Sequence, residues 1–494
     1  MSPHKGLCIL VGVWVAFQWM AGSATAQNES DVFRYTWLMP TGTARYTALG
    51  GAMGALGGDL SVVLSNPAGL GIYRKSQTAM GFGISTSHTR SLYYGSESRE
   101  NRTSVNLPTI GFVGVKELRR KDRYLTGWQF AHFALTYNRT GDFNYRARLR
   151  GVNPESSLIT YFKYNANQMG PPGSLDPYYE ELLFRAQVLL YDTLTGQYMD
   201  FIQPWPHTNK LQDFYYNTWG NTGELGLNFA ANYANRLYLG GGLNFILGQY
   251  RQFVRQQESD PMDLTPEFKD FILEQRLQTS LSGINLRVGA IVRPTDWVRL
   301  GVAFHSPCWL WLRDRYSNRV AATYDNSGST GWLDSPFGAF NYGITTPLKL
   351  HASVGFTVQK LVALGLDYEF TDLSRARFRS GFFFMPTNEI IRSSFNTRHT
   401  VRTGLELKLD PLYLRGGFQY YSNGYQPHLN TMQTWSASGG LAFRLKRWTI
   451  DGAYVLYRVK PQISPYPSQA LNPLEPARVV HHLHAVVLGF SFNF

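Results

Sequence analysis

Cysteine, charge and long apolar runs are all scarce in this chain of 494 residues, and each shortage excludes a class of protein. Only Cys8 and Cys308 are present, too few for a disulfide framework, and no base is identifiable beside Cys308 for thiol catalysis. The only continuous apolar run, residues 6–20, is too short for a transmembrane helix. The HExxH and GxSxG motifs are absent. We therefore expect neither an enzyme nor a helical membrane protein.

The short apolar run has the features of an export signal. It follows His4 and Lys5 and precedes the small residues of Ala24-Thr25-Ala26, a pattern typical of a secretory cleavage site. We therefore expect a signal peptide at residues 1–26.

The end of the chain alternates between large apolar residues and residues that are mostly small or polar. The two sets are Phe494, Phe492, Phe490, Leu488 and Val486 against Asn493, Ser491, Gly489, Val487 and Ala485. A strand with one apolar face for lipid and one small face for a lumen, ending in an aromatic residue, is typical of the closing strand of a bacterial outer-membrane barrel. Taken alone, the segment also fits a half-buried strand of a soluble sheet.

Thirteen further segments share this period of two, and an even total suits a closed antiparallel barrel. Tight turns such as 293–296 alternate with long polar insertions such as 144–221 and 306–347, which is typical of periplasmic turns and extracellular loops. The sequence therefore predicts an all-β fold, a 14-stranded antiparallel transmembrane β-barrel at residues 75–494, in the outer membrane of a Gram-negative bacterium. The predicted strands are 77–89, 104–116, 124–143, 222–235, 237–256, 276–293, 297–313, 348–359, 361–374, 398–409, 411–422, 435–446, 448–460 and 479–494.

Charged residues on these strands have apolar neighbours on both sides, so we expect them to face the lumen rather than lipid. Two interpretations stay open: the charges pair with each other and with a plug, or an arginine receives the anionic head group of a ligand. The candidates are Arg287, Arg299, Arg402, Arg415, Glu224 and Glu406.

Two segments lie outside the barrel pattern. Residues 27–74 are rich in glycine and small apolar residues, which suits a compact plug, or hatch, inside the lumen. Residues 144–221 contain a helix start, with Asp176 at the cap, Pro177 in the first turn and two early glutamates. We expect a partly helical extracellular lid whose aromatic residues either form an apolar vestibule or pack the loop on itself. Those aromatic residues are Tyr161, Phe162, Phe184, Phe201 and Trp205.

The overall composition agrees with a barrel. Aromatic residues make up 15% of the chain, yet the mean hydropathy is −0.24. The formal net charge is +13, but Lys and Arg are spread over loops and alternate positions rather than gathered in one stripe. We therefore expect anionic lipopolysaccharide at the barrel rim as a partner rather than nucleic acid.

Two short motifs ahead of the barrel carry a family resemblance. The run GGAMGALGGD at residues 50–59, followed by SNPAGL at residues 65–70, resembles the FadL and TodX family of outer-membrane transporters for hydrophobic compounds. It is most similar to a Bacteroidetes branch often labelled hemin receptors. By position, the residues that match the hatch motif are Gly50, Gly51, Gly57, Gly58, Asn66, Pro67 and Ala68.

This resemblance implies a fourteen-stranded barrel closed by an N-terminal hatch. It implies passive uptake of fatty acids or similar lipids and aromatics, captured among extracellular loops and passed to a pocket near the hatch. The ligand would then leave sideways beside a kinked third strand, matched here by residues 124–143, in which Gly127 and Gly141 would permit a bend. It implies no cofactor, a monomer, and insertion by the barrel assembly machinery through the strand that ends at Phe494.

Other functions were weighed against this one. His481, His482 and His484 could ligate a metal or haem, although no partner acid or cysteine accompanies them, so no metal site is predicted. The main alternative is an interaction scaffold for protein export of the type IX kind, with extracellular loops that grip cargo. A porin-like diffusion channel is the remaining possibility.

Overall fold

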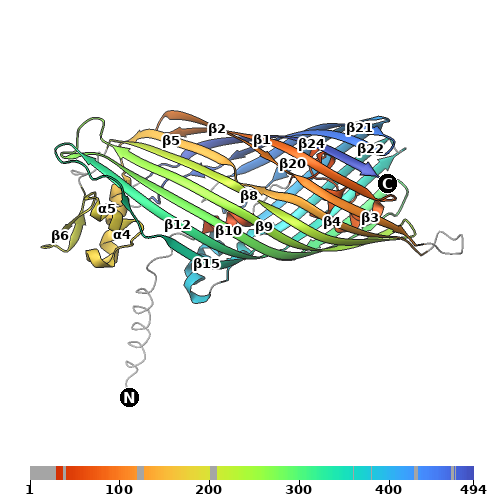
Figure 1. Ribbon diagram of the computed structural model, residues 1–494, viewed down its shortest axis with the longest axis horizontal. Helices are drawn as coiled ribbons and strands as arrows, with labels where there is room; N and C mark the ends of the chain where they lie inside the picture. The colour runs from red at the N-terminus through yellow and green to blue at the C-terminus, as the bar shows by residue number, and fades with distance from the viewer. Residues whose placement is uncertain are drawn as a thin grey trace, which may run out of the picture.

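The computed structural model describes residues 29–36, 41–118, 127–200, 209–359, 361–379, 381–427, 432–468, 472 and 474–494. The predicted signal peptide and two of the predicted vestibule residues, Phe201 and Trp205, lie outside the described residues. The chain forms one closed antiparallel barrel with a small separate hairpin (Figure 1). No described helix is both long enough and apolar enough to cross a membrane.

Fourteen barrel strands follow one another around the wall, and the first pairs with the last to close it. Four of these strands are interrupted, so each of the four consists of two consecutive elements. In order, the barrel strands are β1 (Gln77–Tyr93), β2 (Ser96–Asn106) with β3 (Thr109–Glu117), β4 (Trp128–Asp142) with β5 (Tyr145–Asn153), β8 (Lys210–Tyr233), β9 (Leu237–Ser259), β10 (Phe268–Val292), β11 (Val298–His305) with β12 (Trp309–Tyr324), β15 (Gly338–Thr345) with β16 (Lys349–Val358), β17 (Val362–Asp372), β19 (Thr397–Leu409), β20 (Leu412–Tyr421), β21 (Gln433–Leu445), β22 (Trp448–Lys460) and β24 (Ala477–Asn493).

The predicted barrel is thus confirmed, and so is the orientation of its last strand. Val486, Leu488 and Phe490 of β24 are exposed on the outside, whereas Ala485 and Val487 between them are buried. Side chains alternate in this way because successive residues of a strand point to opposite faces of the sheet.

The wall is taller on one side than on the other. β8, β9 and β10 contain 24, 23 and 25 residues, whereas β17 and β20 contain 11 and 10. Figure 1 shows a lid at the end of the barrel opposite the C-terminus, which we call the lid end. The lid consists of α4 (Leu158–Met169), η3 (Pro172–Ser174), α5 (Glu180–Arg185), β6 (Leu190–Asp192) and β7 (Gln197–Met199).

Two predicted loops are shorter than expected because their ends belong to the wall. The insertion 144–221 begins with β5 and ends within β8, and the loop 306–347 contains all of β12 and β15. In these upper parts the outward residues are polar, as with Arg148 and Arg150, so the apolar alternation of lipid-facing strands is lost.

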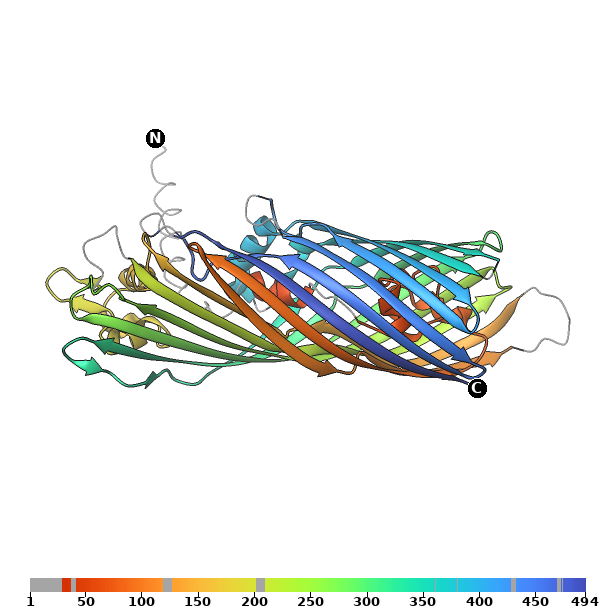
Figure 2. The same cartoon turned by 90° about the horizontal axis from the view of Figure 1, so that it is seen from above.

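Shorter elements complete the chain. Residues 41–76, which we call the inner segment, lie inside the barrel near its C-terminal end (Figure 2). Their side chains pack against the inner faces of β3, β4 and β8. The remaining elements are α2 (Glu29–Thr36), α3 (Ala44–Ala48), η1 (Leu60–Leu64) and η2 (Pro67–Ile72) at the start of the chain, and β13 (Gly328–Ser329), β14 (Leu333–Asp334), η4 (Leu373–Arg375), β18 (Arg377–Phe378), η5 (Gly381–Phe384), α6 (Met385–Ser394) and β23 (Gln462–Ile463) between barrel strands.

Candidate ligand site and its surroundings

Asn66 fixes the inner segment to the barrel wall. Its side-chain oxygen accepts a hydrogen bond from the backbone N–H of Ala68 at 3.1 Å and so caps η2. Its side-chain nitrogen donates to the carbonyl oxygens of Ala290 on β10 and Val302 on β11, at 3.2 and 3.3 Å. With no exposed surface, Asn66 uses both ends of its amide, which explains why this position suits asparagine.

Glycines allow the close contact between the inner segment and the wall. A Cβ on Gly240 of β9 would lie 2.4 Å from the backbone nitrogen of Ala68, too close for any larger residue. The motif glycines Gly50, Gly51, Gly57 and Gly58 all have positive φ, between 59° and 71°, and so form the tight turns of the segment.

A chain of charges links the inner segment to β19, β20 and β22. Arg45 Nε donates to Glu406 Oε2 at 2.8 Å, and Arg415 Nε donates to the same oxygen at 2.8 Å. Arg415 also pairs with Asp451. Arg299, predicted to face the lumen, donates from Nη1 to the carbonyl oxygen of Leu56 at 2.8 Å. These contacts surround a cavity of about 250 Å³ at the C-terminal end of the lumen.

A second charge cluster lies on the other side of the inner segment. The Arg287 guanidinium pairs with both oxygens of Glu224 at 2.5 Å and also donates to the carbonyl oxygen of Val63 at 3.1 Å. Arg402 Nη2 donates to Glu369 Oε2 at 2.6 Å. All six predicted lumen charges therefore point into the barrel, as the alternation of the strands predicts, and contact the inner segment or other inward side chains.

These residues border a buried cavity of about 90 Å³ between the inner segment and the lid end. One part of its lining is apolar or aromatic, and the other is ionic. The apolar part includes Tyr35, Tyr46, Leu64, Ile246, Leu281 and Leu310, and the ionic part includes Glu224, Arg287, Lys349, Glu369 and Arg402.

Some polar groups that line the cavity are incompletely hydrogen-bonded. Arg402 Nη1 and both ring nitrogens of His351 are buried and make no hydrogen bond with the described residues. The His351 ring contacts the ring of His305, with 4.2 Å between the centroids and 35° between the ring planes. Because buried donors are normally satisfied, unpaired nitrogens beside an apolar lining favour an amphiphilic ligand with an anionic head group.

Lys349, His305 and His351 were missed by the sequence analysis. They occupy inward positions of β11 and β16, so the alternation that located Arg287 would also have located them. The predicted strand 297–313 crossed the interruption after His305, where the alternation is no longer continuous.

The hydrogen-bonded wall is interrupted between the second and third barrel strands. The ladder between β3 and β4 runs only as far as Thr109 and Asn138. Among the described residues, β5 forms its ladder with β8, and no ladder joins β5 to β2. A few side chains span the interruption instead, such as Arg102, whose Nε donates to Asn144 Oδ1 at 3.0 Å.

A bulge in β4 accompanies this interruption. The register between β4 and β8 shifts between Arg139 and Gly141, which leaves Thr140 as the extra residue. A cavity of about 410 Å³ opens here in the wall, lined by Ser104, Val105, Asn106, Leu107, Tyr137, Arg139, Asn144, Gly220 and Asn221. Thr140 lines the buried 90 Å³ cavity and its neighbour Arg139 lines the wall cavity, so the bulge contributes one residue to each of the two cavities.

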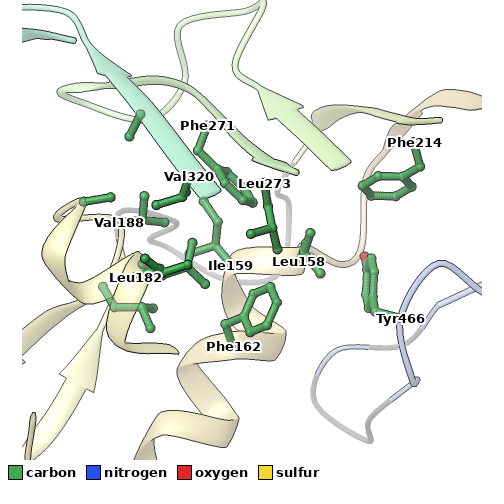
Figure 3. Close-up of a cluster of buried hydrophobic side chains, with 14 of the residues drawn as sticks. Leu158, Ile159, Phe162, Leu182, Val188, Phe214, Phe271, Leu273, Val320 and Tyr466 are labelled. Carbon is green, nitrogen blue, oxygen red and sulfur yellow. The ribbon is translucent and has the colours of Figure 1, made fainter. Parts of the chain in front are cut away.

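The predicted vestibule aromatics pack inside the lid. Phe162 is 5% exposed, and Tyr161 and Phe184 pack against the same cluster of buried apolar side chains. Figure 3 shows this cluster, in which α4 and α5 meet side chains from β10 and β12 such as Phe271 and Val320. The described part of the lid therefore favours the interpretation that these residues hold the loop together.

The lid helix begins later than the sequence predicted. Asp176 accepts a hydrogen bond from the Tyr178 backbone N–H at 2.7 Å, which forms a turn, and α5 starts only at Glu180. Of the terminal histidines, His481 faces inward and bonds to Thr89 at 3.1 Å, whereas His482 and His484 face outward. The described residues contain no group of three or more side chains placed to hold a metal ion.

Comparisons with known proteins identify the fold. No family model and no curated protein matches the chain. A solved structure of a FadL homologue from Pseudomonas aeruginosa matches with a TM-score of 0.55 and 15% identity, over 93% of this chain and 100% of that chain. The Pseudomonas putida toluene transporter TodX matches with a TM-score of 0.52 and 12% identity, over the same shares of the two chains. The fold that the resemblance implied is thus confirmed, and this chain has the fold of the FadL and TodX barrels.

Proposed function

We propose that the protein is an outer-membrane transporter for the passive uptake of hydrophobic compounds, with fatty acids as the class that fits best. The observation that carries this proposal is the β4 bulge, whose consecutive residues Arg139 and Thr140 line two cavities, one open in the wall and one buried beside the inner segment. The lid end would then face the exterior, and the C-terminal end the periplasm. The fold of a FadL homologue and of a toluene transporter is consistent with this assignment.

The cavity lining supports a fatty acid. The cavity of about 90 Å³ has room for the carboxylate near Arg402 and His351, where donors are unpaired, and for the first carbons of the chain beside Ile246 and Leu281. Pairing a carboxylate with an unpaired guanidinium nitrogen in a buried site strengthens binding because no water competes for the donor.

The route out supports lateral release. The inner segment fills the barrel near its C-terminal end and would act as the plug, which leaves the wall cavity as the nearer exit. Release into the membrane has a physical advantage, because an acyl chain that crossed a water-filled pore would expose its apolar surface to water.

The head-group site can be tested with Arg402→Gln in purified protein. Oleate affinity, measured by titration calorimetry in detergent, should fall at least about tenfold, the loss expected for one charge-assisted hydrogen bond. The matched control is Arg148→Gln, which removes an outward guanidinium paired with Asp213. Equal affinity in wild type and Arg402→Gln would refute this head-group site.

The exit can be tested independently by filling the wall cavity. Ser104→Trp places an indole in the cavity, whereas Thr103→Trp places it on the outer face of the same strand. We expect the first variant to bind oleate normally and to lose uptake of labelled oleate into proteoliposomes, and the second to retain both. Unchanged uptake in Ser104→Trp would show that ligands leave by another path.

One observation favours the alternative of an export scaffold. Near the lid end, Leu194 and Phe337 expose 95% and 71% of their surface, which would suit a protein partner. If the protein is a scaffold, Leu194→Ser with Phe337→Ser should abolish surface export in cells and leave oleate uptake intact. Loss of uptake without an export defect would favour transport.

A further inference from the structure

Four arginines form an unneutralised patch on the outer face of the tall wall. Arg251 of β9, Arg276 of β10, and Arg313 and Arg315 of β12 are all exposed. Their neighbours in the strand sequence are turned inward: Leu312 and Asp314, on either side of Arg313, are buried. We call these four side chains the outer arginine patch.

The pairing of the strands brings the four arginines together. Arg251 is opposite Gln278, which is opposite Arg315, so one row crosses three strands. Arg313 lies two residues along β12 from Arg315, a separation of about 7 Å in a strand. Arg276 lies two residues along β10 from Gln278, on the far side of that row.

Two exposed tryptophans and an exposed leucine lie directly below the patch. Trp311 and Trp309, which precede Arg313 on the same face of β12, are 52% and 40% exposed, and Leu247 on β9 is 61% exposed. Tryptophan is typical of the boundary between acyl chains and head groups. The outer arginine patch therefore lies at the level of the lipid head groups, on the side of the membrane that the lid end faces.

Carboxylates do not neutralise this patch. Among the described residues, no ion pair within 4.0 Å involves Arg251, Arg313 or Arg315, and Arg276 reaches Glu274 only at 3.8 Å. Glu274 is already paired with Arg319 at 2.7 Å. Two other arginines of the outer face do have carboxylate partners: Arg99 pairs with Glu97 at 2.7 Å, and Arg148 with Asp213 at 2.5 Å.

A hollow in the wall adjoins the patch. It measures about 390 Å³ and is lined in part by Ser280, Ser282, Trp311, Arg313 and Asn341. Hydroxyl and amide donors, a guanidinium and an indole edge thus frame one depression. Next to it, the guanidinium of Arg379 lies over the Trp311 ring, 5.2 Å from the ring centroid.

We propose that the outer arginine patch and this hollow bind the phosphorylated head group of lipopolysaccharide. The glucosamine phosphates would pair with Arg313 and Arg315, and the sugar hydroxyls would face Ser280 and Asn341. A zwitterionic phospholipid carries its own ammonium group beside the phosphate, so it gains less from an unpaired arginine cluster than a lipid with several phosphates does. The proposal requires an outer-membrane location but not the transport of fatty acids.

The test compares lipid binding by two charge-matched variants in detergent. The patch variant carries Arg251→Gln, Arg313→Gln and Arg315→Gln, and the control carries Lys75→Gln, Lys446→Gln and Arg447→Gln, three exposed cations near the C-terminal end. The probe is bisphosphorylated lipid A, with phosphatidylethanolamine and inorganic phosphate as competitors. Both variants must migrate as folded barrels on unheated gels before binding is measured.

We expect wild type and control to bind lipid A equally, and the patch variant to bind it at least about tenfold more weakly. Phosphatidylethanolamine and inorganic phosphate should compete poorly. Equal weakening in both variants would show a general charge effect and overturn the site. Competition by inorganic phosphate at the concentration of lipid A would show a simple anion site and overturn the lipid assignment.

Discussion

Glu406 of β19 accepts two hydrogen bonds from Arg45 of the inner segment, at 2.8 Å from Nε and 3.1 Å from Nη2. Burial opposes the charge of Arg45, but the contact with Glu406 outweighs this effect and raises the pKa of the guanidinium. Because Glu406 also pairs with Arg415, one wall carboxylate holds two arginines. This residue is therefore the main ionic attachment of the inner segment.

Replacing Glu406 by Gln should loosen the inner segment. Removing one partner from a buried ion pair leaves the other charge uncompensated and costs about 3–5 kcal/mol. We expect frequent open events in single-channel recordings in planar bilayers, and a lower unfolding temperature. Glu97→Gln, which removes an outer-face carboxylate, is the control and should leave both measurements unchanged. A closed, equally stable Glu406→Gln barrel would contradict this role.

Deleting residues 27–74 tests the plug assignment directly. If the inner segment closes the lumen, the deleted protein should conduct ions continuously and admit small solutes into liposomes. Unchanged conductance in a correctly folded deletion variant would mean that the wall and lid close the barrel without the inner segment.

Two adjacent glycines of β9 offer a matched test of packing. Gly240→Ala would bring a methyl group within 2.4 Å of the Ala68 backbone, whereas the nearest atom to a Cβ on Gly241 is the Arg287 carbonyl oxygen at 3.4 Å. We expect the first change to destabilise the protein by about 1–3 kcal/mol, the usual penalty for overpacking, and the second to have little effect. Chemical denaturation of the two variants measures the difference, and equal stabilities would show that the inner segment can move away.

The lid should become less stable as the pH rises. Burial, and to a smaller extent Asp176, raise the pKa of Glu180 to about 7 from an ordinary 4.5, against the Asn165 hydrogen bond. A carboxyl group with a raised pKa in the folded state favours folding fully below pH about 4.5, and this contribution is lost as the pH approaches 7. Hydrogen-exchange protection factors in α4 and α5, that is, exchange rates normalised to the intrinsic rate at each pH, should therefore be larger at pH 5 than at pH 8.

In the same experiment, the protection factors of Glu180→Gln should show little pH dependence between these values. Glu181→Gln, a change at the more exposed neighbour, should retain the wild-type profile. A steep profile in Glu180→Gln would assign the pH dependence to another group, with Asp176 as the first candidate because burial also raises its pKa.

The barrel could be predicted from the sequence because lipid imposes a strict pattern. Wherever a strand faces acyl chains, every second residue must be apolar, so Leu488 and Phe490 reveal their own orientation. The same pattern located Arg287 and Glu406 on the inner face. It also identified fourteen strands, although the ends of several were wrong.

The pattern failed where lipid no longer constrains the sequence. The upper part of β8 carries Asp213 and Asn217 on its outer face, and β5 carries Arg148, so neither resembles a lipid-facing strand. The lid aromatics could not be assigned because the sequence is the same whether Phe162 is buried in the lid or exposed in a vestibule. The cavity at the β4 bulge depends on strand register, which no single strand encodes.

The extra residue at Thr140 also determines which side chains of the upper wall face outward. Below the bulge, even-numbered residues such as Ala134 are buried, and above it odd-numbered residues such as Leu149 are buried. Removing one residue at this point would exchange the two sets: Leu149 would turn toward the solvent, and Arg148 and Arg150 would turn into the apolar core beneath the lid. Sequences that share this architecture should therefore tolerate changes of residue type at the bulge far better than changes of chain length.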